Sequence, residues 1–249
     1  MTGGIEGRTA IVGGSSTGLG FAVARDLAGR GANVLIVSRS EQRVAAAVGA
    51  IQENGGAAEG CAADFTDPDA PRRVVDRARE LYGTPDIVVA NGGGPPGMPA
   101  TAATAEDLAA ACDLLLLPVQ RFAELTLPAM RASGWGRFVA ITSIAVREPL
   151  PGLVLSNALR AAVTGYLKSV SDEVASDGVT VNTVCPGFTG TDRLGVLAAN
   201  VAERDGVSVD EVFVGWAAQA PVRRLLRPEE VAAAVGFLCS AAASGITGV

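Results

Sequence analysis

The chain has 249 residues, of which 49% are hydrophobic and 18% are charged, and its 20 lysines and arginines against 26 aspartates and glutamates give a net charge of −6. This length suits a single domain, and the acidic balance without a run of basic residues argues against nucleic-acid binding. No apolar stretch reaches the roughly 18 residues that span a bilayer, and residues 1–8 lack the basic start and apolar core of a signal peptide. We therefore expect a cytoplasmic protein that binds neither nucleic acid nor membrane.

Short apolar runs rich in β-branched residues alternate with longer Ala-rich amphipathic segments along the chain. In chain order, the runs predict strands at residues 9–12, 33–37, 58–63 (the weakest), 86–90, 137–141 and 179–184. The segments between and after them predict helices near residues 19–29, 42–53, 70–81, 105–131, 155–176 and 228–239. Such alternation favours parallel strands joined by right-handed helical crossovers. We predict an α/β fold, a single domain over residues 1–249 with a Rossmann-type doubly wound parallel sheet flanked by helices.

Two segments depart from this simple alternation. Pro118 and Pro128 interrupt the helical pattern of residues 105–131, and a kink or an early end is expected there because proline removes an amide donor and clashes with the preceding turn. Residues 187–217 form a long insertion of helical character. This insertion is either a lid over a substrate or an ordinary surface excursion.

A glycine-rich loop follows the first predicted strand, at the point where the first helix begins. Gly14 can permit a tight turn, Gly18 a close approach to a diphosphate, and Gly20 close packing of helix on strand. The helix N-terminus offers free amides and a positive dipole end to a phosphate. The spacing is G-x-x-x-G-x-G, and its place between a strand and a helix indicates a dinucleotide site.

The second predicted strand ends in Ser38 and Arg39. An acidic residue at this place would hold the ribose hydroxyls of NAD, whereas a cation accommodates the extra phosphate of NADP. The planar fork of arginine suits phosphate oxygens, so the pair indicates NADP(H). The alternative is that Arg39 is a solvated surface charge.

At this point the sequence resembles the classical short-chain dehydrogenase/reductase family nearly end to end. The glycine loop matches the nucleotide loop of that family, residues 63–65 look like its adenine-contacting segment, residues 90–93 look like its N-N-A-G motif, and residues 182–187 are similar to its segment after the sixth strand. The cofactor-binding set is thus expected to be Gly14, Ser16, Thr17, Gly18, Leu19, Gly20, Ser38, Arg39, Asp64, Phe65, Asn91, Gly92, Arg160, Pro186, Gly187, Thr189 and Thr191, with the two threonines facing the nicotinamide carboxamide. For Asp64 and Asn91 the alternatives are a capping aspartate and a turn-stabilising asparagine.

The C-terminal region carries the resemblance further. Residues 221–225 and 228–231 resemble the C-terminal signature of the family, which usually adds a last strand, whereas this sequence stops at Gly248-Val249. That strand, and the tetramer contact it often helps to make, are therefore in doubt. The resemblance still implies a homo-oligomer, a dimer or a tetramer, associated through the Ala-rich helices.

Histidine is absent, which excludes a conventional serine hydrolase, since histidine is the usual base of a nucleophilic triad and the commonest metal ligand. The four cysteines lie far apart and form no C-x-x-C pair, so they build no zinc site. We expect buried, reduced thiols at Cys61, Cys112, Cys185 and Cys239.

The resemblance also implies a catalytic site. In the family a tyrosine protonates the carbonyl oxygen during hydride transfer, a lysine four residues later lowers the pKa of that tyrosine and holds the ribose, and a serine thirteen residues earlier hydrogen-bonds the oxygen. Ser143 matches the serine, but Ser156 stands at the tyrosine position and Arg160 at the lysine position. Leu115 stands where the family has an asparagine that supports a water relay. Ser143, Ser156 and Arg160 are therefore the expected catalytic positions.

These replacements differ in chemistry from the residues they replace. A serine hydroxyl is far less acidic than a phenol, so Ser156 is a poor general acid that could position water or substrate. Arginine hardly ever releases a proton, so we expect Arg160 to anchor the ribose and supply positive charge. Tyr166 lies nearly three helical turns beyond Ser156, and Asn157 points roughly 100° away from it. The alternative is that Ser156 is a helix N-cap and Arg160 a solvated helix charge.

We predict an NADP(H)-dependent oxidoreductase, similar to 3-oxoacyl-[acyl-carrier-protein] reductases, with a non-standard proton-delivery system. Its substrate would be a carbonyl, enone or quinone of a small apolar or acyl compound, because the loops expected around the site are mostly apolar. The alternatives are a redox-silent isomerase, dehydratase or cyclase on the same fold, and a nucleotide-binding protein without catalysis. Trp216, in the insertion, is either a packing residue or a substrate platform.

Overall fold

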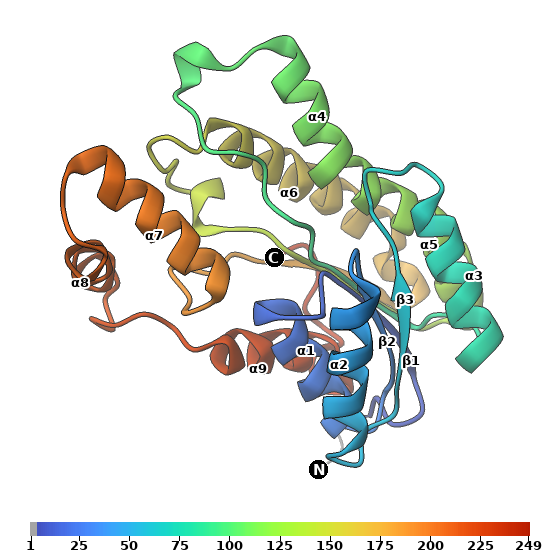
Figure 1. The fold of residues 1–249 in the computed structure, drawn as a ribbon. Coiled ribbons are helices and arrows are strands. Elements are labelled where there is room, and N and C mark those ends of the chain that lie inside the picture. Colours follow the sequence, from blue (N-terminus) through green and yellow to red (C-terminus); the bar gives the residue numbers. More distant parts are fainter. Residues whose placement is uncertain (1–3) are drawn as a thin grey trace.

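One sheet of six parallel strands, with helices on both faces, forms the centre of the computed structural model, which describes residues 4–249 (Figure 1). The strands are β1 (Thr9–Gly13), β2 (Asn33–Ser38), β3 (Ala58–Ala62), β4 (Ile87–Ala90), β5 (Gly136–Ile141) and β6 (Val179–Val184). Their order is β3-β2-β1-β4-β5-β6, and every neighbouring pair runs parallel. The predicted Rossmann-type α/β fold is confirmed. The order reverses between β1 and β4, and folds of this kind bind ligands outside the carboxyl ends of the strands at that point.

The helices lie in two layers, one on each face of the sheet. Helices α1 (Gly18–Gly29), α2 (Glu41–Gln52) and α9 (Pro228–Leu238) cover one face, and α3 (Ala70–Tyr82), α5 (Leu117–Ser133) and α6 (Val154–Val174) cover the other. Helix α4 (Ala105–Leu115) packs on α5 and α6, whereas α7 (Asp192–Asp205) and α8 (Val209–Gln219) pack on each other. Single turns of 3-10 helix are η1 (Ala100–Ala102), η2 (Ile144–Val146), η3 (Ala175–Asp177) and η4 (Ala241–Ala243).

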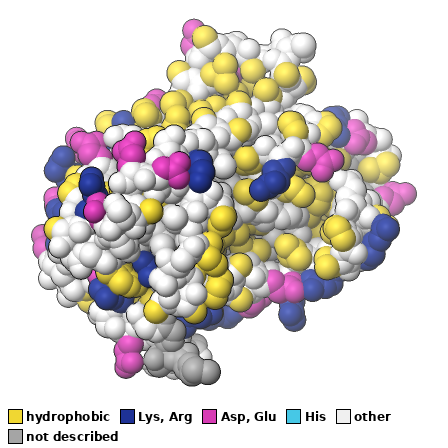
Figure 2. All heavy atoms as spheres, turned by 180° about the vertical axis from the view of Figure 1, so that it is seen from behind, with side chains coloured by type: hydrophobic (Ala, Val, Ile, Leu, Met, Phe, Trp, Pro, Cys, Tyr) yellow, Lys and Arg dark blue, Asp and Glu magenta, His cyan; other side chains and the backbone are white. Residues whose placement is uncertain are grey.

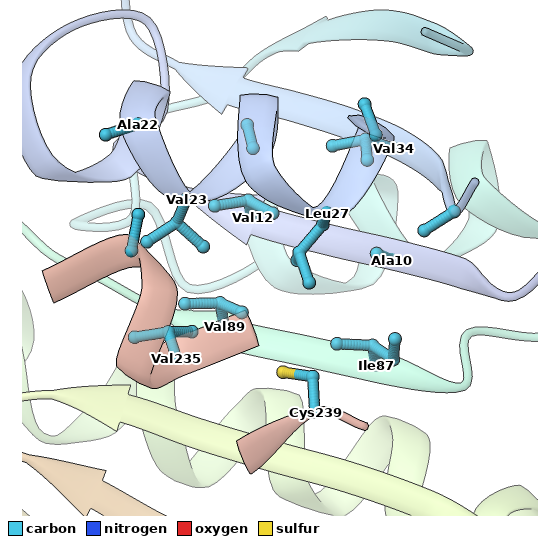
Figure 3. Close-up of a cluster of buried hydrophobic side chains, with 14 of the residues drawn as sticks. Ala10, Val12, Ala22, Val23, Leu27, Val34, Ile87, Val89, Val235 and Cys239 are labelled. Atoms are coloured by element: carbon cyan, nitrogen blue, oxygen red, sulfur yellow. The ribbon is translucent and has the colours of Figure 1, made fainter. Parts of the chain in front are cut away.

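Alternate residues of each central strand build the two faces of the core. Val12 lies in the cluster beneath α1 and α9, where Figure 3 shows it beside Val23 and Leu27, with Val235 next to Val89. The preceding residue, Ile11, belongs to the other cluster, under α3, α5 and α6. Because a parallel strand is buried on both faces, its sequence is a continuous apolar run, which is why these strands were recognisable.

The two prolines of the predicted helix 105–131 behave differently. The pattern breaks between α4 and α5, and Pro118 lies in the first turn of α5, where a missing N–H removes no helical bond. Pro128 lies inside α5, which continues to Ser133, so of the two expected alternatives, a kink or an early end, the early end is wrong at this proline. Phe122 and Met130, before and after it, are both buried in the core, and this packing holds the helix together across the lost hydrogen bond.

The end of the chain lies beside β6. The amide of Gly248 donates to the carbonyl of Val181 (2.8 Å), and the carbonyl of Val249 accepts from the amide of Thr183 (2.7 Å). The buried side chain of Asn182 donates to the carbonyl of Ile246 (2.8 Å) and accepts from the amide of Val249 (3.2 Å). No seventh strand is assigned within residues 4–249, yet the last residues bond to the sheet edge where that strand would lie.

Residues 187–217 form mainly α7 and α8, which stand to one side of the sheet (Figure 1). The rings of Phe188 and Trp216 stack with centroids 4.7 Å apart, so α8 is fastened to the segment that follows β6. Trp216 also contacts Phe213 and the small apolar cluster between the two helices. These contacts give Trp216 the packing role.

No helix in residues 4–249 is both long and apolar enough to cross a membrane, and no cluster of potential metal ligands occurs there. On the face that Figure 2 shows, acidic and basic side chains are interspersed. All four cysteines are free of disulfides, but only Cys239 is buried, so the expected burial is wrong for Cys61, Cys112 and Cys185, which are half-buried.

Candidate functional site

The glycine loop makes a tight turn between β1 and α1. Gly14 and Gly18 have φ angles of +55° and +58°, a region that L side chains rarely adopt. A Cβ atom at Gly14 would lie 2.6 Å from the carbonyl oxygen of Asn91, and one at Gly20 would overlap with the carbonyl of Gly14. The side chain of the N-cap residue Thr17 does not cap α1. The first-turn amides, which include those of Gly18, Leu19 and Gly20, therefore remain free to bind an anion.

Two polar side chains fix the position of this loop. Nδ2 of Asn91 donates to the carbonyls of Gly13 (3.2 Å) and Gly14 (3.3 Å), which is the turn-stabilising role considered for this residue. The buried Ser15 was not among the predicted residues. Its Oγ donates to the carbonyl of Val12 (2.6 Å) and accepts from the amide of Val37 (2.9 Å). Ser15 joins the loop to β1 and β2 by these bonds. The sequence indicates such a role only by placing a serine in the glycine loop directly after a buried strand.

The carboxyl end of β2 holds a buried hydroxyl without a partner. Oγ of Ser38 forms no hydrogen bond with any residue of the described chain, and Arg39 beside it is exposed. The Asp64 carboxylate accepts from the amide (3.0 Å) and hydroxyl (2.9 Å) of Thr66. These bonds, with a smaller contribution from the charge of Arg39, lower the pKa of Asp64. A buried hydroxyl that lacks a partner is unfavourable, so this place fits a ligand that supplies oxygen acceptors.

The remaining predicted cofactor residues lie at the same edge of the sheet. Phe65 packs edge-on against Phe122. Its Cε2 atom lies so close to Gly13 that a Cβ atom at Gly13 would be 3.1 Å from it. The hydroxyl of Thr189 donates to the carbonyl of Gly187 (3.0 Å), and Thr191 caps α7 beside Gly18. Further members are Ser16, half-buried in the glycine loop, Gly92, which contacts α4, and Pro186, whose carbonyl accepts from Ile144.

Arg160 is the most extensively bonded side chain of the site. Its Nε donates to Oγ of Ser156 (3.0 Å), and its Nη1 donates to the carbonyls of Ile141 (3.1 Å) and Thr142 (3.2 Å) at the end of β5. Its Nη2 donates to the carbonyl of Gly93, after β4 (3.1 Å). The alternative that Arg160 is a solvated helix charge is wrong, because tertiary packing turns the guanidinium group into the protein.

The pKa of Arg160 reflects this environment. Burial, and secondarily the charge of Arg193, lower the pKa of Arg160 to about 10. The guanidinium group therefore stays charged near pH 7 and places a fixed positive charge at the carboxyl ends of β4 and β5. These four hydrogen bonds leave one of its five N–H groups, on Nη2, free for a ligand.

The two serines lie on different elements at this end of the sheet. Ser143 is the N-cap of η2, and its Oγ accepts from the amide of Ala145 (3.1 Å). Ser156 lies within α6, whose N-cap is Leu153, so the alternative that Ser156 is an N-cap is wrong. Both hydroxyls accept a hydrogen bond, and neither donates one to a residue of the described chain. Their protons are therefore available to an acceptor in the site.

Leu115 ends α4 and is buried in an apolar cluster with Leu155 and Leu159. A cavity of about 20 Å³ lies beside Leu115 and Arg160, bounded also by Thr142 and Val163. This volume has room for about one water molecule. Leu115 offers that water no polar partner, so a proton path through this position is absent from the described chain.

Two further residues do not join the site. The side chain of Asn157 donates to the carbonyl of Leu150 (2.9 Å) and accepts from its amide (3.4 Å), which ties α6 to the preceding loop. Tyr166 packs against the core formed with α5, and burial raises its pKa. Both side chains are therefore engaged away from Ser156 and Arg160.

Known proteins are similar to this chain over nearly its whole length. The family model described as enoyl-(acyl carrier protein) reductase matches residues 14–249. The 3-oxoacyl-[acyl-carrier-protein] reductase FabG of Vibrio cholerae is 34% identical over 98% of this chain and 94% of that protein.

Two solved structures show the same architecture. The L-sorbose reductase of Gluconobacter frateurii, complexed with NADPH and L-sorbose, is 31% identical and covers 100% of this chain and 95% of its own, with a TM-score of 0.93. A 3-oxoacyl (acyl-carrier-protein) reductase of Agrobacterium tumefaciens with NADP bound is 34% identical and covers 98% of this chain and 92% of its own, with a TM-score of 0.88. The predicted family is confirmed: the chain belongs to the short-chain dehydrogenase/reductase family.

Proposed function

We propose that this protein is an NADP(H)-dependent reductase of a carbonyl compound, in which Ser156, polarised by Arg160, delivers the proton that a tyrosine usually delivers. The observation that carries this proposal is the hydrogen bond from Nε of Arg160 to Oγ of Ser156. Because Oγ accepts this bond and donates none to the described chain, its proton can bond to a substrate oxygen.

The residues present fit the nucleotide. The uncapped first turn of α1 offers amides to a diphosphate, and the unpaired hydroxyl of Ser38 with the exposed Arg39 offers donors to a 2′-phosphate. The solved relatives with NADPH or NADP support the same choice. When bound, NADPH supplies a hydride to the carbonyl carbon of the substrate.

Negative charge develops on the carbonyl oxygen as the hydride arrives, and three side chains can stabilise this charge. The hydroxyls of Ser143 and Ser156 would hold this oxygen by hydrogen bonds, and the fixed charge of Arg160 lies directly behind Ser156. Preorganised donors and charge of this kind stabilise an oxyanion far better inside a protein than in water. The proton passes from Ser156 to the oxygen and is replaced from solvent, because Leu115 closes the internal route.

The weak acidity of serine sets a requirement on the substrate. A positioned proton donor of matched pKa contributes roughly 10²–10⁴-fold in rate, and Ser156 supplies only part of this. A carbonyl, enone or quinone that is already activated needs the least assistance. We expect the substrate to carry a small apolar or acyl chain, because the loops around the site are mostly apolar.

Hydride transfer is the decisive test. With (4R)- and (4S)-deuterated NADPH in separate reactions on a ketone or aldehyde, we expect one of the two to place deuterium on the alcohol carbon of the product, with one nucleotide oxidised per product formed. Turnover that transfers label from neither nucleotide and oxidises none would overturn the proposal in favour of a redox-silent isomerase, dehydratase or cyclase. Nucleotide binding without turnover on any carbonyl compound would overturn it in favour of a nucleotide-binding protein.

A further inference from the structure

Two arginine side chains from different helices meet at the loop after β4. Nη2 of Arg160, on α6, donates to the carbonyl of Gly93. The guanidinium group of Arg193, in the first turn of α7, lies over Gly94, because a Cβ atom there would overlap with Nη2 and Cζ of Arg193. The two cationic groups therefore lie at adjacent residues of one loop.

Neither charge is neutralised by the part of the chain that the structure describes. Every ion pair found in residues 4–249 involves other cations. Arg160 keeps one free N–H on Nη2, and Arg193 donates no hydrogen bond to a described residue. Partial burial lowers the pKa of Arg193, and its charge in turn lowers the pKa of Arg160, so the two like charges act on each other. An anion between them would relieve this repulsion.

The position of the pair separates it from the phosphate sites of the nucleotide. The diphosphate has the first-turn amides of α1, and the 2′-phosphate has Ser38 and Arg39 at the end of β2. Arg160, by contrast, is bonded to Ile141 at the end of β5, to Thr142 just after it, and to Ser156. The arginine pair thus lies at the end of the site where the carbonyl group is proposed to react.

We infer that Arg193, together with the free N–H of Arg160, binds a carboxylate group of the substrate. The substrate would then be an oxo acid, and a neutral ketone or a thioester would be a poorer one. This inference rests on the proposed function, because it names the substrate class for the same site. The guanidinium fork suits two carboxylate oxygens, and it would equally suit a phosphate of the nucleotide, so a test must separate these two anions.

Calorimetric titration of the NADP-saturated protein tests the site without turnover. We expect hexanoate to bind, and hexanamide, which has the same length and no charge, to bind roughly 10- to 100-fold more weakly, as for the loss of a charge-assisted bond. Arg193→Leu should remove this difference. Arg72→Leu, which removes an exposed arginine of α3, is the matched control and should preserve it.

Kinetics with straight-chain 2-, 3- and 4-oxo acids and their methyl esters give a second measurement. Arg193→Leu should lower kcat/KM for the preferred acid by roughly 10- to 100-fold and leave that for its ester nearly unchanged. The inference is wrong if hexanoate and hexanamide bind equally, or if neither binds. It is also wrong if Arg193→Leu weakens NADPH while the preference for hexanoate persists, since the arginine would then serve the nucleotide.

The two proposals can fail separately. If hexanoate binds in the Arg193-dependent manner but no carbonyl compound is reduced, the anion site is supported and the proposed reductase is wrong. If neutral ketones are reduced while acids and esters are treated alike, the reductase is supported and the anion site is wrong.

Discussion

Nε of Arg160 donates to Oγ of Ser156 over 3.0 Å, across one turn of α6. By the resemblance these two residues stand where the family has its tyrosine and lysine, and we propose that this bonded hydroxyl and guanidinium replace the pair that usually performs proton transfer. The hydroxyl retains a donor proton and the guanidinium retains a charge. On this proposal the site has a less acidic proton donor than a tyrosine, but the donor is still polarised by a cation.

Replacing Ser156 by alanine tests this donor directly. We expect Ser156→Ala to lower kcat by roughly 10²-fold, at the lower end of the range for a positioned proton donor, with the Kd for NADPH unchanged. Ser169→Ala, which removes another hydroxyl from α6, serves as the control and should leave kcat unaltered. An unchanged kcat for Ser156→Ala would remove Ser156 from the mechanism.

Arg160 should also matter for folding. In Arg160→Met the carbonyls of Ile141 and Thr142 lose their side-chain donor inside the protein. We expect the free energy of unfolding, measured by urea denaturation, to fall by about 2–4 kcal/mol. Arg77→Met breaks only an exposed pair with Glu80 and should cost less than about 1 kcal/mol. Equal effects of the two substitutions would contradict the buried role of Arg160.

Ser38 should affect stability and cofactor binding in opposite directions. Its hydroxyl is buried without a partner, so Ser38→Ala should leave the free energy of unfolding of the nucleotide-free protein unchanged or raise it by about 1 kcal/mol. The same substitution should weaken NADPH roughly 10-fold, because the phosphate loses a donor. Thermal unfolding with and without NADPH measures both effects. A variant that loses stability but not affinity would show that the hydroxyl has a structural role.

Arg39 should discriminate between the two nicotinamide nucleotides. Arg39→Ala is expected to raise the Kd for NADPH by roughly 10- to 100-fold and to leave the Kd for NADH nearly unchanged, since only NADPH carries the 2′-phosphate. Fluorescence titration with both nucleotides gives the two values. Arg43→Ala removes a nearby exposed arginine and is the control. Equal weakening of both nucleotides would refute the 2′-phosphate assignment.

The side chain of Asn182 should hold the end of the chain against β6. Asn182→Ala removes bonds to Ile246 and Val249 and leaves their polar groups without this partner. We expect the free energy of unfolding to fall by about 2 kcal/mol. Asn54→Ala, which removes one exposed bond to Ala50, should cost much less. If the two substitutions cost the same, the contact of the last residues with β6 contributes little.

The alternation of apolar runs with amphipathic segments determined the α/β fold, and the spacing of the glycines determined the nucleotide loop. Both patterns are local properties of the chain. A strand buried on both faces must be a continuous apolar run, and a turn with a positive φ angle at Gly14 selects glycine. The strand-to-glycine-to-helix order was therefore recognisable before any contact was known. The resemblance to the family likewise predicts Ser143, Ser156 and Arg160 as the catalytic positions.

Only the tertiary structure decided what those residues do. The bonds of Arg160 to Ile141, Thr142 and Gly93 join segments 19, 18 and 67 residues away, and no local pattern encodes which acceptor a long side chain will reach. The placement of Arg193 over Gly94 depends on how α7 lies against the loop after β4. The course of α5 through Pro128 was also decided by tertiary structure, because packing of α5 against the sheet outweighs the local tendency of proline to end a helix.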